Sequence, residues 1–342
     1  MDKRVILLNG PSSSGKSTLA AALAERIRAK TGESFGVVSI DDFMKIAKDE
    51  VIYEDDVWEI AGDMIGAALR LLEGGSGVII DHVITSPRIY GGLVSALERY
   101  GLLTVQVTCD PEVLKSREAA RGDRRSGTAD SSLEYLYPKD GYGMEIDTGV
   151  SSPAECAEAI FRRLVRERVS LRGMVRDDIG DYVRWFTTVT GWMDTDAPWE
   201  RETASEEEER RAWTEYYDAV GDLPADAERR KYEIEYRGVH VGWVCSYFDL
   251  DYVPNPDMIP AVGIDIPEES ARGFGVGTAA LGMFIDELRR RGAGRVFTQT
   301  WSGNAAMLRT AGKLGFVPYA AAEGIREVDG KAYDALTLVL DM

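Results

Sequence analysis

The sequence predicts an α/β protein built from two domains, and three observations carry that prediction. Apolar, strand-like runs alternate with amphipathic helical stretches through residues 5–165. A second alternation begins near residue 169. In each half, one strand runs through a glycine-rich loop into a helix. Because strict alternation is typical of a parallel sheet with helices on both faces, we expect such a sheet in the first half.

Short apolar runs and longer periodic stretches place the elements of the first half. Ser152 is a candidate helix cap, Pro153 would occupy the first helical position and Glu155 lies three residues past the cap, which together indicate a helix start. The expected strands are Val5–Leu8, Phe35–Ile40, Gly77–Ile80 and Leu103–Thr108, and the expected helices are Ser17–Lys30, Val57–Leu72 and Ala154–Val165.

The second half begins where the pattern restarts, so we expect domains at 1–167 and 168–342. No Gly/Ser or Pro linker marks the boundary. Six of the seven tryptophans fall in this half, where we expect them in the core or in a pocket wall. The expected elements around its glycine loop are strands Ile259–Ile266 and Arg295–Thr300 and a helix at Thr278–Arg291.

Composition excludes several classes of function. A net charge of −18 argues against a nucleic-acid partner and permits a cationic small-molecule substrate. No apolar stretch approaches 18 residues, so no membrane span is expected. The chain enters a strand at Val5 without the pattern of a signal peptide, and its three cysteines are scattered, which suits the cytoplasm. Two histidines make a His-based metal site or a Ser-His-Asp triad unexpected.

The first glycine loop fits the pattern G-x-x-x-x-G-K-[ST] at every fixed position, between a strand and a helix. Its N–H groups would surround a phosphate, Lys16 would reach the outer phosphates and Ser17 would hold Mg²⁺. The pattern predicts ATP as the cofactor, with GTP left open. The candidate binding residues are Gly10, Ser12, Ser13, Ser14, Gly15, Lys16, Ser17 and Thr18.

Carboxylates follow two of the predicted parallel strands. Asp41 and Asp42 come after the second strand, and Asp81 and His82 after the third. Ligands of parallel α/β sheets lie beyond the carboxyl ends of the strands. Each aspartate could orient a hydroxyl, help to hold magnesium or cap a helix. We expect Asp41 to be the catalytic base, with Asp81 also catalytic.

Arginines gather after the fourth strand, at positions 117, 121, 124 and 125. We expect Arg121 and Arg124 to neutralise charge from a mobile lid as a phosphoryl group moves. A solvated helix face is the alternative interpretation.

At this point residues 1–166 resemble the chloramphenicol phosphotransferase-like family of P-loop kinases. That family transfers the γ-phosphate of ATP to a hydroxyl of an antibiotic-like molecule. The resemblance implies that Asp41 is the base and that Arg121 and Arg124 belong to the lid. It rests on Gly10–Ser17, Ile40-Asp41-Asp42-Phe43, Ile79-Ile80-Asp81, Arg121-Gly122-Asp123-Arg124-Arg125-Ser126-Gly127, and Glu145-Ile146-Asp147-Thr148 before the Ser152-Pro153 helix.

The second glycine loop has the spacing R/Q-x-x-G-x-G/A and again precedes a helix. Backbone N–H groups in that position bind a pyrophosphate. The pattern gains weight from a following strand, from Ser302-Gly303-Asn304 and from a helix that ends in Gly312-Lys313-Leu314-Gly315-Phe316. The candidate binding residues are Arg272, Gly273, Phe274, Gly275, Val276, Gly277 and Thr278.

This series resembles the GCN5-related N-acetyltransferase (GNAT) fold, in its ribosomal-protein-acetyltransferase-like branch, over about 169–342. The resemblance implies acetyl-CoA as cofactor. It also implies that the backbone of Ile264 and Ile266 pairs with the pantetheine arm and that Asn304 lies near the thioester. Asn304 could equally cap a helix, and the two roles are compatible.

The sequence departs from the resemblance at the catalytic acid. Many members carry a tyrosine where this chain has Ala311. The base is left unassigned among four candidates, and positioning of the amine can itself carry much of the rate. These candidates are Asp265, Glu268, Glu269 and His240.

Together the two loops predict a cytoplasmic bifunctional enzyme, an O-phosphotransferase fused to an N-acetyltransferase. Its substrate would be a small molecule of the antibiotic or aminosugar type that carries a hydroxyl and an amine. A cationic substrate is compatible with the acidic chain. An antibiotic substrate would connect the enzyme with antibiotic resistance. Two alternatives stay open: a kinase regulated by a catalytically silent acetyl-CoA-binding half, and a protein N-terminal acetyltransferase with a fused kinase. A homodimer is compatible with the sequence.

Overall fold

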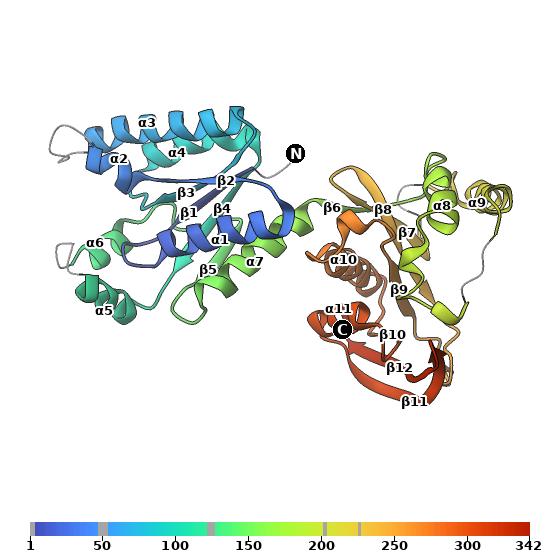
Figure 1. Cartoon of the computed structure of the whole chain (residues 1–342). Coiled ribbons are helices and arrows are strands. Elements are labelled where there is room, and N and C mark those ends of the chain that lie inside the picture. Colours follow the sequence, from blue (N-terminus) through green and yellow to red (C-terminus); the bar gives the residue numbers. More distant parts are fainter. Residues whose placement is uncertain (1–3, 47–53, 122–126, 201–203, 225–226) are drawn as a thin grey trace. The chain divides into compact units, whose positions relative to one another are not determined.

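The computed structural model describes residues 4–46, 54–121, 127–200, 204–224 and 227–342. The chain divides into two compact units, Met1–Leu164 and Val165–Met342, each with its own sheet (Figure 1). The division falls inside one helix, α7 (Pro153–Glu167). The domain limits expected from the sequence stay a prediction. Within the described residues, no helix is both long and apolar enough to cross a membrane.

The first unit contains a five-stranded sheet in the order β2-β3-β1-β4-β5, and every pair in it is parallel. This confirms the parallel sheet that alternation predicts. All carboxyl ends of the strands therefore meet at one edge. The strands are β1 (Val5–Asn9), β2 (Phe35–Ser39), β3 (Gly77–His82), β4 (Leu102–Thr108) and β5 (Met144–Asp147).

Helices cover both faces of this sheet (Figure 1). Side chains of β1 and β3 form a buried core with α3 and α4 on one face, and α1 packs on the other. Ile40 opens helix α2 instead of ending the second strand, so Asp41 lies in a first helical turn. The helices are α1 (Lys16–Thr31), α2 (Ile40–Ile46), α3 (Glu54–Glu73), α4 (Pro87–Leu97), α5 (Pro111–Arg121), α6 (Thr128–Tyr135) and α7.

The second unit contains a seven-stranded sheet in the order β11-β12-β10-β9-β8-β7-β6. All neighbours are antiparallel except β9 and β10, which run parallel. The strands are β6 (Val169–Arg172), β7 (Lys231–Tyr236), β8 (Val239–Tyr247), β9 (Ala261–Asp265), β10 (Arg295–Trp301), β11 (Val317–Val328) and β12 (Lys331–Asp341).

The parallel pair separates after one point of contact. Ala261 pairs with Phe297, and the Thr298 hydroxyl donates to the carbonyl of Val262 at 2.8 Å. Beyond that point β9 keeps its register with β8 alone, up to the pair Trp243 and Asp265. The middle of the sheet is therefore split, and the far end of β9 has one open edge.

Helices and an aromatic core complete this unit. The core joins Tyr182, Trp185, Trp192 and Trp243, which confirms that tryptophans of this half lie inside it. The helices are α8 (Asp178–Thr187), α9 (Glu206–Val220), α10 (Val276–Arg290) and α11 (Ala305–Leu314), with short 3-10 turns at Thr190–Trp192, Pro198–Glu200 and Glu269–Ala271.

Candidate active sites

The first glycine loop connects β1 to α1 and has the geometry of an anion cradle. Gly15 precedes the helix at φ 85°, a left-handed conformation that favours glycine. Its N-cap residue, Gly15, has no side chain to bond the first amides of α1, and such amides have no partner within the helix, an arrangement that suits an anion. At Gly10, a Cβ would lie 2.2 Å from the carbonyl oxygen of Val107 in β4, so only glycine fits there.

Side chains around the loop fix its charged groups. Lys16 is buried, and its Nζ donates to the carbonyl of Pro11 at 2.8 Å. The Ser17 hydroxyl donates to Oδ2 of Asp81 at 2.5 Å, so a hydroxyl and a carboxylate from neighbouring elements meet at the loop. Oxygen ligands of these kinds are those that Mg²⁺ prefers.

A cavity of about 830 Å³ opens over this loop. Asp81 and His82 line it from the end of β3, and Asp41 lines it from the first turn of α2, just beyond β2. Gly10 and Ser14 do not line it, and Asp42 is exposed and pairs with Lys45. The predicted loop residues that line the cavity are Ser12, Ser13, Gly15, Lys16, Ser17 and Thr18.

Among the arginine side chains that the structure describes, Arg117 of α5 lines this cavity. Its guanidinium donates to the carbonyl of Thr148 at 2.8 Å, and the Thr148 hydroxyl donates to the carbonyl of Ser14 at 2.5 Å. Arg117 therefore buttresses the phosphate loop through Thr148. Arg121 ends α5 with its side chain outside the description, and Arg124 lies outside the described residues. Their lid role stays a prediction. In the sequence, the spacing of four residues between Arg117 and Arg121 was the signal that could have pointed to Arg117.

The second glycine loop also has a left-handed glycine directly before its helix. Gly275 precedes α10 at φ 111°, again without a side-chain cap from the described residues. Arg272 does not extend freely from the loop: its Nε donates to the carbonyl of Ile266 at 2.7 Å and its Nη2 to that of Pro267 at 2.9 Å. The arginine thus fastens the loop to the end of β9.

A cavity of about 640 Å³ lies in the split between β9 and β10. Ile264 and Ile266 line one wall, and Asn304 lines it while its side chain also accepts from Met307 N at 2.9 Å as the cap of α11. The loop contributes Arg272, Gly273, Gly275, Gly277 and Thr278. Val276 is buried and Phe274 packs against Tyr236, so neither side chain lines the cavity.

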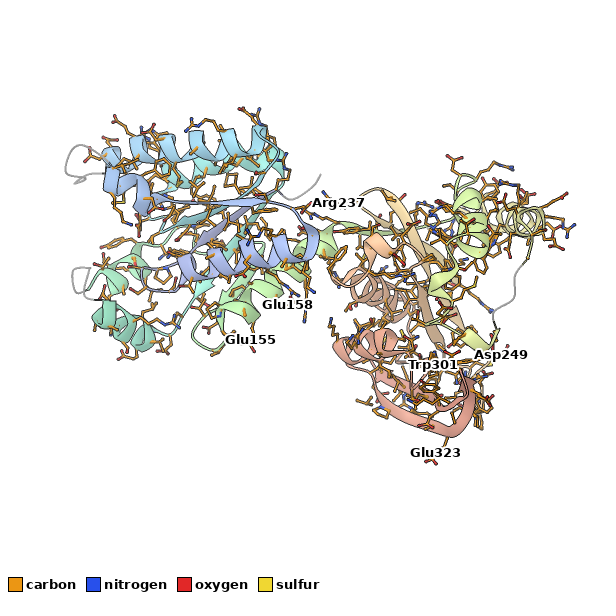
Figure 2. The ribbon with its side chains drawn as sticks, viewed as in Figure 1. Glu155, Glu158, Arg237, Asp249, Trp301 and Glu323 are labelled. Atoms are coloured by element: carbon orange, nitrogen blue, oxygen red, sulfur yellow. The ribbon has the colours of Figure 1, made fainter. Side chains whose placement is uncertain are left out.

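Asp265 is the base candidate that faces this cavity. Burial, and then the nearby carboxylate of Asp196, raise the pKa of Asp265 well above its usual value, although the cations of Lys231 and Arg272 oppose the shift. A carboxylate with a raised pKa is a better proton acceptor near neutral pH. Asp249 and Trp301 line the same cavity and are marked in Figure 2.

The two halves of the chain match different protein families. Residues 3–165 match the family described as chloramphenicol phosphotransferase-like protein, and residues 168–317 match the acetyltransferase (GNAT) domain. The chain fuses two transferase domains. We refer to them as the phosphotransferase-like domain and the GNAT domain. The search of curated proteins gave no match.

Solved structures similar to this chain each cover about half of it. They include an N-acetyltransferase of Staphylococcus aureus Mu50 (16% identity, TM-score 0.39, covering 51% of this chain and 98% of that one). The acetyltransferase yncA of Salmonella typhimurium, solved with acetyl-CoA, has 20% identity, a TM-score of 0.38 and coverages of 51% and 94%. A ribosomal-protein-alanine N-acetyltransferase of Brucella melitensis has 19% identity, a TM-score of 0.39 and coverages of 51% and 99%.

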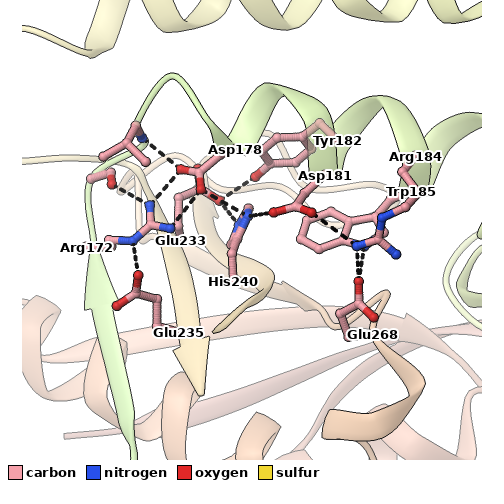
Figure 3. A network of polar contacts seen from close by, with 12 residues as sticks. Arg172, Asp178, Asp181, Tyr182, Arg184, Trp185, Glu233, Glu235, His240 and Glu268 are labelled. Carbon is pink, nitrogen blue, oxygen red and sulfur yellow. Dashed lines mark hydrogen bonds and ion pairs between the residues drawn. The ribbon is translucent and has the colours of Figure 1, made fainter. Parts of the chain in front are cut away.

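Two further base candidates of the GNAT domain lie in a buried polar network (Figure 3). His240 Nδ1 lies 3.2 Å from Asp178 and 3.1 Å from Asp181, and its Nε2 lies 3.1 Å from Glu233. Glu268 accepts from Trp185 Nε1 at 2.8 Å and from Arg184.

Hydrogen bonds and ion pairs engage the side chains of both residues. Although burial raises it, hydrogen bonds from Trp185 and Arg184 hold the pKa of Glu268 below its usual value. Neither Glu268 nor His240 lines the cavity, and Glu269 is exposed in the turn Glu269–Ala271. Ala311, at the position where many relatives of the fold carry a tyrosine, is fully buried.

Proposed function

We propose that this protein is a bifunctional small-molecule-modifying enzyme, an ATP-dependent O-phosphotransferase (1–167) fused to an acetyl-CoA-dependent N-acetyltransferase (168–342). One observation carries the proposal. Each domain has a cavity lined both by the start of an uncapped helix after a left-handed glycine and by a carboxylate, Asp41 in one and Asp265 in the other. A cradle for an anion beside a proton acceptor suits group transfer from a phosphorylated cofactor.

In the phosphotransferase-like domain, the fit to ATP and Mg²⁺ rests on Lys16, Ser17 and Asp81. Lys16 is buried beside the loop, and the Ser17–Asp81 pair offers oxygen ligands to the metal. When bound, ATP would supply the γ-phosphoryl group. Asp41 would take the proton of the acceptor hydroxyl as its oxygen accepts that group, and ADP would leave.

In the GNAT domain, the loop 272–278 suits the pyrophosphate of acetyl-CoA, and the open edge of β9 suits its pantetheine arm. Within the described residues, the β10 side of β9 has no strand partner beyond Ala261, so the backbone near Ile264 can hydrogen-bond an extended chain there as a neighbouring strand would. When bound, acetyl-CoA would supply the acetyl group. Asp265 would take a proton from the acceptor ammonium, and the freed amine would accept the acetyl group as the C–S bond breaks and coenzyme A leaves as the thiol with the second amine proton.

The carboxylates of this cavity suit a positively charged acceptor. Asp196, Glu200 and Asp249 line it together with Trp199 and Trp301, and Arg326 lies over the Trp199 ring at 4.3 Å. The cations that line the same cavity suit the phosphates of the cofactor; they are Arg272, Arg309, Lys313 and Arg326. Carboxylates attract ammonium groups, and indole faces bind cations. An aminosugar-type antibiotic or metabolite has the matching chemistry, with several amines and hydroxyls on one scaffold.

Mass spectrometry of an acceptor panel tests this function. The panel contains aminoglycosides, other aminosugars and chloramphenicol, incubated with the protein, Mg²⁺, ATP and acetyl-CoA singly and together. Asp41→Asn and Asp265→Asn serve as matched controls for each other. We expect Asp41→Asn to abolish the phosphoryl gain and keep the acetyl gain, and Asp265→Asn to do the reverse. Absence of both gains with wild-type protein on every compound would contradict the proposal.

The same experiment addresses the regulatory alternative, which the buried Ala311 favours. In that case acetyl-CoA would bind without any acetyl gain and would change the rate of phosphoryl transfer. Cytoplasmic location and a role in antibiotic resistance belong to this proposal, and growth of a susceptible strain that expresses the protein in the presence of an accepted antibiotic tests the latter.

A further inference from the structure

His82 occupies the strand edge on which the phosphate loop is built. It is the last residue of β3 and pairs in register with Asn9, the residue just before Gly10. It is 2% exposed and nevertheless lines the cavity above the loop. The histidine is therefore enclosed by protein but borders the space where a nucleotide would lie.

The side chains of Asn9 and His82, which are neighbours across two strands, differ in their hydrogen bonds. Asn9 accepts from the amide of Ile84 at 2.9 Å and donates to the carbonyl of Tyr137 at 2.9 Å and to the Tyr142 hydroxyl at 2.7 Å. Within the described residues, neither ring nitrogen of His82 has a hydrogen-bond partner. Buried polar groups are almost always hydrogen-bonded, so an unpaired imidazole beside a cavity indicates a group reserved for a ligand.

The lining of the cavity shows which part of a ligand His82 would meet. Lys16, which would serve the outer phosphates, and Asp41, the proposed base for the acceptor hydroxyl, line the same cavity as His82. An imidazole carries at least one ring N–H that can donate a hydrogen bond in both its neutral and its protonated form.

We propose that His82 donates a hydrogen bond to the γ-phosphoryl group of ATP. This inference rests on the proposed phosphotransferase function. The other charged groups that line the cavity are Asp81, which is tied to Ser17, and Arg117, which is tied to Thr148. The N–H of His82, in the cavity that Lys16 and Asp41 also line, is a further hydrogen-bond donor for the γ-phosphoryl group.

Nucleotide binding tests the proposal without any acceptor. The affinities of wild-type protein, His82→Ala and His82→Asn are measured by calorimetry for Mg²⁺–ADP and for the Mg²⁺ complex of the β,γ-imido analogue of ATP. Hydrogen bonds to charged groups are worth enough that His82→Ala should bind the analogue about 10- to 100-fold more weakly. ADP lacks the γ-phosphoryl group, so its affinity should not change. His82→Asn keeps an N–H donor and should recover part of the loss.

Asp42→Asn is the control, because Asp42 is exposed beside Asp41 and lies outside the cavity. It should leave both affinities unchanged. An equal loss of ADP and analogue affinity in His82→Ala would show a structural role and overturn the inference, as would no loss of either. If wild-type protein binds neither nucleotide, the proposed phosphotransferase function fails as well. If the wild-type protein and His82→Ala show the same ratio of analogue affinity to ADP affinity, only the role of His82 is contradicted.

Discussion

The surroundings of the two histidines of this chain are opposite, although both side chains are buried. His240 is 7% exposed and lies between three carboxylates of the GNAT domain, Asp178, Asp181 and Glu233. His82, in the phosphotransferase-like domain, has no hydrogen-bond partner within the described residues. Burial lowers the pKa of both rings, but the hydrogen bond to Glu233 and the charge of Asp178 outweigh it and raise the pKa of His240.

This difference separates a histidine that holds the fold from one that is available to a ligand. A fully partnered polar network fixes one arrangement of its elements, here β6, β7, β8 and α8. An unpartnered buried group costs stability and is retained where function needs it. Burial alone cannot distinguish the two cases; the hydrogen-bond partners can.

The largest expected effect comes from breaking the partnered site. His240→Ala leaves Asp178, Asp181 and Glu233 facing one another without the imidazolium between them. Removal of one member of a buried ionic network typically costs about 3–5 kcal/mol. Denaturant unfolding followed by tryptophan fluorescence measures this, because six of the seven tryptophans lie in that half. A loss below about 1 kcal/mol would show that the network does not depend on His240.

The two sites should also respond to pH in opposite directions. The pKa of His82 falls from 6.5 to about 4, so its contribution is present above pH 6.5 and is lost as pH falls toward 4, by about 3 kcal/mol. The pKa of His240 is raised, so its contribution is full below pH 6.5 and is lost as pH rises through the folded-state value. Hydrogen exchange of each domain between pH 4 and 8, with His82→Leu and His240→Ala as references, measures both slopes. Parallel slopes in the two domains would contradict the comparison.

A milder change removes one partner from the network and keeps the ring. The Tyr182 hydroxyl donates to Glu233 at 2.5 Å while its ring stacks on Trp213 at 3.7 Å. Tyr182→Phe should cost about 2 kcal/mol, the usual range for a hydrogen bond to a charged group. The same fluorescence-detected unfolding measures it. If Tyr182→Phe is neutral, water satisfies Glu233 and the network is looser than its distances indicate.

The smallest effect should have the opposite sign. His82→Leu replaces an unsatisfied imidazole by an apolar group, so we expect a gain of about 1 kcal/mol in the free energy of unfolding. Calorimetric unfolding of the unliganded protein measures it, and hydrogen exchange assigns the gain to the phosphotransferase-like domain. A substantial loss of stability would mean that His82 is needed for packing.

The sequence was sufficient for those parts of the sites that depend on local pattern. The loop Gly10–Ser17 and its flanking strand and helix are contiguous, and Asp41 and Asp81 meet because the carboxyl ends of parallel strands share an edge. The role of Arg117 could not be read in this way, because it depends on Thr148, 31 residues away. The same applies to His240, whose partners come from α8 and β7, and to Asp265, whose raised pKa depends on burial and on Asp196.

The split between β9 and β10 also bears on strand pairing between copies of the protein. Unpaired strand edges are templates for unwanted pairing when they are exposed. Here the open part of β9 has β8 on one side and borders the cavity on the other, with α10 packed against the strand. The outermost strand on the β9 side of the sheet is instead the four-residue β6. A hydrogen-bonding edge can thus stay available to a narrow extended ligand while it is shielded from the broad edge of another sheet.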